Sequence, residues 1–286
     1  MQDLKVSIIQ TSLFWENKEQ NLKLITQQIE AIKSKPDLIV LPEMFNTGFS
    51  MLPKKLAEPE IGPTLKWMQI MAAQSGAAIA GSLMVFDQNN YYNRLYFVEP
   101  DGSFQSYDKR HLFRMGNEDH HFSPGNKKLI VNYKNWKINF LICYDLRFPV
   151  WSKNNYLNQH YDYDLLVVVA NWPAVRSHIW EALIRARAIE NQAFVVAVNR
   201  IGNDGNELAH SGNSNIVDPK GNFLIQNSHN NEMVDTVVLN YNELEDFRNK
   251  FKVGLDWDYF SIDYSTNPPQ SNDEFNDKQV QKDYNG

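Results

Sequence analysis

The apolar residues of this 286-residue chain fall into short continuous runs separated by segments with helical spacing. Residues 4–10 form a first apolar run, which predicts a buried strand. Residues 21–32 place apolar side chains three and four positions apart, which predicts a helix, and residues 38–41 form a second apolar run. The order strand, helix, strand indicates a layered α/β domain.

The rest of the chain continues this pattern up to about residue 262. Further strands are predicted at residues 77–86, 92–98, 137–143, 165–170, 193–198, 216–218, 223–226 and 234–239, and helices at 63–75, 177–192 and 242–250. Ser177 is the expected N-cap of its helix, and residues 199–214 are expected to form a polar loop. From Asp263 the composition becomes polar, so we expect one domain at 1–262 and a tail at 263–286 that is disordered or packed on a partner.

The composition narrows the possible functions. One cysteine in the whole chain excludes an intrachain disulfide and a cysteine-cluster metal centre, and it favours a reducing compartment. The N-terminal residues lack the pattern of a signal peptide, and no apolar run approaches the roughly 18 residues of a membrane helix. A net charge of -6 argues against a general nucleic-acid binder. We therefore expect a cytoplasmic protein without membrane or nucleic-acid partners.

The single cysteine, Cys143, stands at the end of a predicted strand, directly before a polar turn and Pro149. In open α/β sheets, ligand chemistry sits at the carboxyl ends of the strands. A thiol on a tight turn at the positive end of the next helix is expected to be more acidic than a free thiol, and the thiolate is the nucleophile. The alternative is a buried cysteine that acts only as a small hydrophobic residue.

Two further charged residues occupy comparable positions. Glu43 follows the predicted strand at 38–41, and Lys109 lies in a short charged segment, Tyr-Asp-Lys-Arg-His. Taken singly, these residues fit a solvated loop carboxylate and a surface lysine. Taken together with Cys143, they supply a base, a cation and a nucleophile, which are the groups that amide cleavage requires.

The surrounding motifs resemble those of a known family. Pro42-Glu-Met-Phe, Lys109-Arg-His-Leu-Phe and Cys143-Tyr-Asp-Leu-Arg-Phe-Pro occur in the order of the nitrilase superfamily of carbon–nitrogen hydrolases, as do Ala170-Asn-Trp-Pro and Ala186-Arg-Ala-Ile-Glu-Asn-Gln. Within that superfamily the chain looks most like the omega-amidase branch. The resemblance implies a four-layer α-β-β-α sandwich of two mixed sheets, a homodimer, and hydrolysis of the terminal amide of 2-oxoglutaramate or a similar carboxylated substrate.

The resemblance also implies a role for each residue. Cys143 attacks the amide carbon and forms a thioester, while Glu43 accepts the thiol proton, passes it to the leaving ammonia and later activates water. Lys109 and the backbone N–H of Tyr144 bind the oxyanion. Glu118 falls where the family has a second glutamate, which orients the lysine and the water. The Glu-Lys-Cys triad needs no cofactor.

A carboxylated substrate would need a cation in the pocket, and arginine binds carboxylates through two parallel hydrogen bonds. Arg176 is the first candidate and Arg147 the second, although Arg147 could instead pair with Asp145 or with helix carbonyls. Trp172 and Phe45 could line the pocket, or they could simply belong to the core.

Three histidines, His111, His120 and His121, raise the question of a metal site, but their spacing matches no known ligand set, so no metal is expected. Three other functions remain open. The same site could act on a nitrile or an N-carbamoyl compound, Cys143 could be a redox sensor, or the protein could be a binding or scaffold protein without catalysis.

Overall fold

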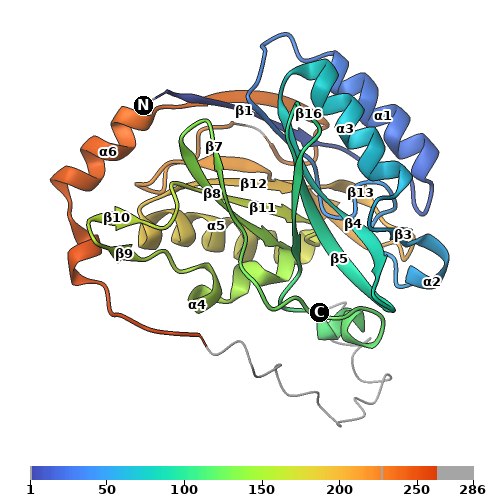
Figure 1. Cartoon of the computed structure of the whole chain (residues 1–286). Coiled ribbons are helices and arrows are strands. Elements are labelled where there is room, and N and C mark those ends of the chain that lie inside the picture. Colours follow the sequence, from blue (N-terminus) through green and yellow to red (C-terminus); the bar gives the residue numbers. More distant parts are fainter. Residues whose placement is uncertain (1, 227, 263–286) are drawn as a thin grey trace.

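The structure is a computed structural model that describes residues 2–226 and 228–262. Two β-sheets pack face to face, and helices cover their outer faces (Figure 1). The predicted tail at 263–286 lies outside the described residues. Among the residues that are described, no helix has the length and apolar character needed to cross a lipid bilayer.

The first sheet contains seven strands in the order β16-β1-β2-β4-β5-β6, with β3 paired to β4. Its strands are β1 (Leu4–Gln10), β2 (Leu38–Val40), β3 (Glu58–Pro59), β4 (Ala78–Asp87), β5 (Asn90–Val98), β6 (Phe104–Asp108) and β16 (Met233–Leu239). β1, β2 and β4 run parallel, whereas β16, β5 and β6 pair antiparallel with their neighbours. The sheet is therefore mixed.

The second sheet is also mixed and has the order β15-β12-β11-β8-β7. Its strands are β7 (Ile130–Tyr133), β8 (Trp136–Ile142), β11 (Leu165–Ala170), β12 (Phe194–Asn199) and β15 (Asn215–Val217). β8, β11 and β12 run parallel, so their carboxyl ends lie at the same edge. Cys143 follows β8 and Asn171 follows β11, which places both residues at that edge.

Strand β2 shows how the alternation of side chains builds the layers. Leu38 and Val40 pack into the core between the two sheets, whereas Ile39 packs on the outer side with residues of α1 (Lys18–Glu30) and α3 (Pro63–Ser75). Figure 1 shows α1 and α3 together over the first sheet and α5 (Ser177–Asn191) along the second. The predicted α-β-β-α sandwich is confirmed.

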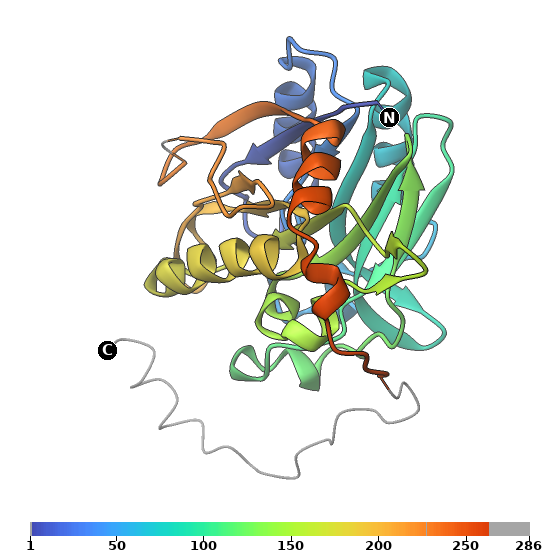
Figure 2. The same cartoon turned by 90° about the vertical axis from the view of Figure 1, so that its left-hand side faces the viewer.

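Short elements complete the fold. They are α2 (Pro53–Leu56), α4 (Pro149–Ser152), α6 (Tyr241–Lys250), the strand pairs β9 (Tyr156–Leu157) with β10 (His160–Tyr161) and β13 (Ile201–Asn203) with β14 (Ala209–Ser211), and the 3-10 turns η1 (Arg114–Gly116), η2 (Glu118–His120), η3 (Cys143–Arg147), η4 (Ala174–Arg176) and η5 (Val253–Asp256). Figure 2 shows α6 running along one side of the sandwich, toward the last described residues.

Some sequence-based expectations need correction. The first helix begins at Lys18, three residues earlier than expected, because the Asn17 side chain accepts a hydrogen bond from Gln20 N and caps it. Ser177 is not an N-cap, since η4 leads directly into α5 and Arg176 takes the cap position without a side-chain bond. The expected loop at 199–214 contains the β13–β14 hairpin. Residues 223–226 form no full strand, but the expected pairing with residues 216–218 is present in short form, since Phe223 makes an antiparallel bridge with Val217 and Leu224 N donates to the carbonyl of Ile216.

Candidate active site

Cys143 begins η3 at the end of β8, with φ of +46°. This left-handed conformation is unfavourable for a residue with a side chain, by about 1 kcal/mol, and such strain concentrates at functional sites. The residue is 9% exposed, and its Sγ lies 3.8 Å from the carbonyl oxygen of Asn171. The sharp turn thus ends the strand and leaves the sulfur at the edge of the sheet.

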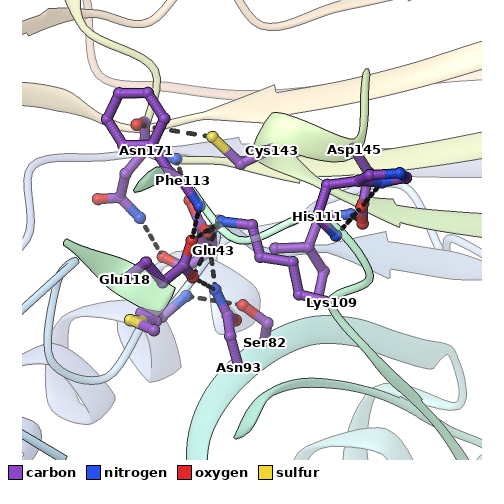
Figure 3. Close-up of polar contacts among 12 residues, drawn as sticks. Glu43, Ser82, Asn93, Lys109, His111, Phe113, Glu118, Cys143, Asp145 and Asn171 are labelled. Carbon is purple, nitrogen blue, oxygen red and sulfur yellow. Dashed lines mark hydrogen bonds and ion pairs between the residues drawn. The ribbon is translucent and has the colours of Figure 1, made fainter. Parts of the chain in front are cut away.

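Three charged side chains meet beside this turn (Figure 3). Lys109 Nζ lies 2.9 Å from Glu43 Oε1 and 2.8 Å from Glu118 Oε2, and all three side chains are fully buried. Glu43 follows β2, Lys109 follows β6 and Glu118 opens η2, so distant segments of the chain bring them together. The expected proximity of Glu43 and Lys109 to the cysteine turn is what the structure shows.

Two asparagines that the sequence analysis did not assign to the site hold this cluster in place. Asn93, on β5, donates through Nδ2 to Glu43 Oε1 (2.8 Å) and to Glu118 Oε1 (3.2 Å). Asn171 donates through its backbone N–H to Glu43 Oε2 (2.8 Å) and through Nδ2 to the Glu43 carbonyl (2.6 Å). A polar residue inside an apolar strand was the sequence signal for Asn93, and the conspicuous Ala-Asn-Trp-Pro segment was the signal for Asn171.

The two glutamates differ in how fully they are hydrogen bonded. Glu118 accepts four bonds: two from Lys109, one from Asn93, and one from the backbone N–H of Phe113 (2.6 Å). Glu43 accepts three from the described residues, of which only the Asn171 N–H reaches Oε2. A carboxylate has about four acceptor positions. Glu43 therefore retains one acceptor position on Oε2, whereas Glu118 is saturated.

The charged groups of the cluster shift one another's pKa values. Burial disfavours the Lys109 ammonium, but the carboxylates of Glu118 and Glu43 outweigh it and raise the pKa of Lys109, so it stays charged. Burial and the Glu43 charge raise the pKa of Glu118, against the effect of Lys109. The cluster thus keeps a fixed cation between two carboxylates.

The expected acidity of the Cys143 thiol is wrong. Burial, together with the negative charges of Glu43 and Glu118, raises the pKa of Cys143 well above its ordinary value, although Lys109 acts in the opposite direction. The turn that follows is a five-residue 3-10 segment and not a helix with a substantial dipole. Burial and the neighbouring carboxylates therefore favour the protonated form of the thiol.

A cavity of about 120 Å³ opens at the sulfur. Its lining residues are Phe49, Met51, Phe113, Gly116, Cys143, Tyr144, Arg147, Asn171, Trp172, Pro173, Arg176, Asp204, Asn206, Leu208 and His210. The lining includes five of the site residues expected from the sequence, namely Cys143, Tyr144, Arg147, Trp172 and Arg176. Glu43, Lys109 and Glu118 lie outside the lining, fully buried.

Phe45 does not line this cavity, contrary to expectation. It is fully buried in the cluster between the first sheet and α3, with its ring centre 5.7 Å from that of Trp67. Gly81 on β4 leaves the space for this ring, because a Cβ there would lie 2.8 Å from Phe45 Cδ1. Phe49 and Phe113 supply aromatic lining instead.

Arg147 is not paired with Asp145, so this part of the structural alternative is wrong. Its guanidinium lies over the ring of Trp172, with 5.1 Å between Cζ and the ring centre. Asp145 bonds to His111 instead, through the backbone N–H and Nδ1 of the histidine. His111 also stacks on Phe148, with 3.7 Å between the ring centres, which gives it a structural role.

The described residues contain no cluster of three histidine, cysteine or acidic side chains suited to a metal ion.

With this geometry in place, comparison with known proteins identifies the class. The model of the carbon–nitrogen hydrolase family matches residues 5–249. The chain belongs to this family, and the resemblance seen in the motifs is confirmed. It is accordingly an enzyme, a hydrolase of carbon–nitrogen bonds.

Particular relatives refine this assignment. The chain is 43% identical to "Omega-amidase YafV" of Escherichia coli K12, over 92% of this chain and 100% of that protein. It is 33% identical to "2-oxoglutaramate amidase" of Bacillus subtilis, over 77% of this chain and 85% of that protein. The structure of XC1258 from Xanthomonas campestris, a CN-hydrolase superfamily protein with an arsenic adduct in the active site, superimposes with a TM-score of 0.89 at 41% identity, covering 92% of this chain and 100% of that one.

Proposed function

We propose that the protein is a cysteine-dependent amidase that hydrolyses the terminal amide of a small carboxylated substrate, such as 2-oxoglutaramate, to the acid and ammonia. The observation that carries this proposal is the buried Glu43–Lys109–Glu118 cluster next to a strained, cavity-lining Cys143. Both named amidase relatives support this substrate class.

In the proposed mechanism, Glu43 takes the thiol proton as Cys143 attacks the amide carbon. The free acceptor position on Glu43 Oε2 suits it to this task, since its other acceptor positions hold the carboxylate in place. Lys109 and the backbone N–H of Tyr144 stabilise the oxyanion, and one such donor typically contributes about 3 kcal/mol. The carbon–nitrogen bond then breaks, Glu43 protonates the leaving ammonia, and water activated by Glu43 hydrolyses the thioester.

Glu118 serves as a positioning residue in this scheme. Its four acceptor positions are occupied, so it holds Lys109 and does not exchange protons with the substrate. Because burial and the two carboxylates raise the pKa of the thiol, Cys143 depends on Glu43 as a base in this scheme.

Arg147 and Arg176 supply the positive charge for the substrate carboxylate. Arg147 rests on Trp172, and Arg176 lies over the ring of Phe113, with 5.5 Å between Cζ and the ring centre. Stacking on a ring restricts a guanidinium and lowers the entropy lost on binding. Both arginines face one cavity, so we propose that they share the recognition of the carboxylate.

The direct test is mass spectrometry of the purified protein mixed with a panel of amides. A mass increase equal to the acyl group, located on Cys143, is expected with 2-oxoglutaramate, and the Cys143→Ala variant should show neither adduct nor ammonia release. Ammonia release by Cys143→Ala at more than about 1% of the wild-type rate would exclude the mechanism.

Recognition of the carboxylate is tested separately. Arg176→Ala and Arg147→Ala should each raise KM by about tenfold for a carboxylated amide, because a charged hydrogen bond is lost, and should leave KM for a neutral amide of the same length nearly unchanged. Equal effects on both amides would contradict this role.

Two other activities are distinguished by the same panel. Adduct formation with an aliphatic nitrile or an N-carbamoyl compound, but not with 2-oxoglutaramate, would assign the site to another carbon–nitrogen bond. A redox sensor is disfavoured by the raised pKa of Cys143, because oxidation proceeds through the thiolate.

A homodimer and a cytoplasmic location stay predictions from the sequence.

A further inference from the structure

The β13–β14 hairpin forms one wall of the cavity, at a place where the sequence analysis expected only a loop. His210, on β14, pairs across the hairpin with Gly202. His210 is only 3% exposed and lines the same cavity as Cys143. The hairpin therefore brings a histidine to the substrate site.

The imidazole lacks a full set of partners. Nδ1 of His210 is buried, and residues 2–226 and 228–262 offer it no hydrogen bond. Leaving a buried polar atom unpaired costs free energy, and such atoms are rare in folded proteins. Backbone groups of Gly202 and Leu208 also lie within hydrogen-bonding reach of the ring. The imidazole thus has hydrogen-bonding capacity that the described residues do not fully use, and the residue lies on the cavity wall.

The ring is uncharged at neutral pH. Burial, together with the nearby positive charge of Arg200, lowers the pKa of His210 to about 4. A neutral imidazole carries one N–H donor and one acceptor nitrogen. It is therefore suited to a neutral polar group and contributes little to the binding of a carboxylate, which Arg147 and Arg176 can bind.

Asp204, another polar residue of the hairpin, already has hydrogen-bond partners within the turn. Asp204 accepts through Oδ1 the backbone N–H groups of Asn206 (2.8 Å) and Leu208 (3.0 Å), and so holds the turn closed. The cations Arg147, Arg176 and Arg200 near the cavity also disfavour a substrate that carries an ammonium group. An uncharged oxygen is the group that fits this wall best.

We propose that His210 determines specificity by hydrogen bonding to the 2-oxo oxygen of the substrate, which lies between the amide held at Cys143 and the carboxylate held by the arginines. This inference rests on the function proposed above and assigns the third recognition contact of the same site. It makes His210 a residue that selects among carboxylated amides, with no part in the bond-breaking steps.

The test compares two amides, 2-oxoglutaramate and glutaramate, which is the same five-carbon compound without the 2-oxo oxygen. Wild type should prefer 2-oxoglutaramate in kcat/KM. His210→Leu should lower kcat/KM for 2-oxoglutaramate by about 30-fold and for glutaramate by less than about threefold, because only the first substrate loses a hydrogen bond. His210→Gln, which keeps a donor and an acceptor, should recover most of the preference.

Each other outcome overturns the inference. Equal losses on both substrates would show a structural role for His210, and a wild type that does not discriminate between them would show that the 2-oxo group is not recognised. If wild type releases ammonia from neither amide, the proposed function fails and this inference fails with it. Hydrolysis of both amides without preference instead leaves the proposed function intact and refutes the role of His210 alone.

A second measurement covers the case in which His210→Leu does not fold. In the Cys143→Ala protein, the NMR signals of the His210 imidazole should shift when 2-oxoglutaramate is added and stay unchanged with glutaramate. Equal shifts, or no shift with either compound at saturation, would refute the contact.

Discussion

Two buried carboxylates lie near the Cys143 turn, and their surroundings differ. Asp145, inside η3, accepts four hydrogen bonds: two from His111, one from the Tyr107 hydroxyl (2.7 Å) and one from Ile142 N (3.1 Å). Glu43 accepts three from the described residues. Both side chains are fully buried.

This difference in hydrogen bonding distinguishes a carboxylate that holds the turn in place from one that still has an open acceptor position. Asp145 links β6 of the first sheet to the turn after β8 of the second, so its saturated oxygens hold the Cys143 turn in its strained conformation. Glu43 accepts two hydrogen bonds on Oε1 but only one on Oε2, so Oε2 keeps an open acceptor position. A buried carboxylate that must accept and return a proton needs such an open position.

The largest expected effect is on Glu43. Glu43→Gln should lower kcat by about 10³-fold, because the amide cannot accept the thiol proton or activate water. Single-turnover kinetics should show both acylation and deacylation slowed. If only KM changed, Glu43 would be a binding residue and the contrast with Asp145 would disappear.

A substitution of Glu118 tests whether a carboxylate with all of its acceptor positions occupied acts only by holding its neighbours in place. Glu118→Gln should lower kcat by about 10- to 100-fold, since Lys109 loses one of its two carboxylate partners but Glu43 still accepts protons. The pH dependence of kcat/KM identifies the base. A loss as large as that of Glu43→Gln would assign proton transfer to Glu118.

Asp145→Asn is the matched control. We expect a loss of about 2 kcal/mol in the free energy of unfolding, because hydrogen bonds to a charged acceptor are replaced, and a kcat within about threefold of wild type for the folded fraction. Thermal denaturation and active-site titration measure the two quantities. A stable protein with strongly reduced kcat would show that Asp145 acts in the reaction.

The smallest expected effect is a shift in thiol reactivity. Negative charge on Glu43 raises the pKa of Cys143, so removing that charge in Glu43→Gln should lower it. Alkylation of Cys143 by iodoacetamide should therefore reach half its maximum rate at a lower pH in the variant than in wild type. An unchanged profile would show that Glu43 does not interact electrostatically with the thiol.

The sequence predicted the elements that depend on local pattern. The strands at 4–10 and 165–170 have the expected bounds, because continuous apolar runs are the direct signature of buried strands. Glu43, Lys109 and Cys143 were predicted as site residues because each stands at the end of an element and within a family motif. The predicted places of Phe45 and of the Ser177 cap were wrong, since each depends on neighbours that are distant in the chain or on how one turn leads into the next.

The succession of the main strands and helices along the chain, and the choice of Glu43, Lys109 and Cys143 as site candidates, therefore follow from the sequence itself, since hydrophobic periodicity and short motifs are local. The tertiary structure decided which carboxylate is saturated and which keeps an open acceptor position, that burial and the two glutamates raise the pKa of the thiol, and that Asn93, Asn171 and His210 reach the site. These properties depend on burial and on donors from other strands, and burial is created only when the two sheets pack together.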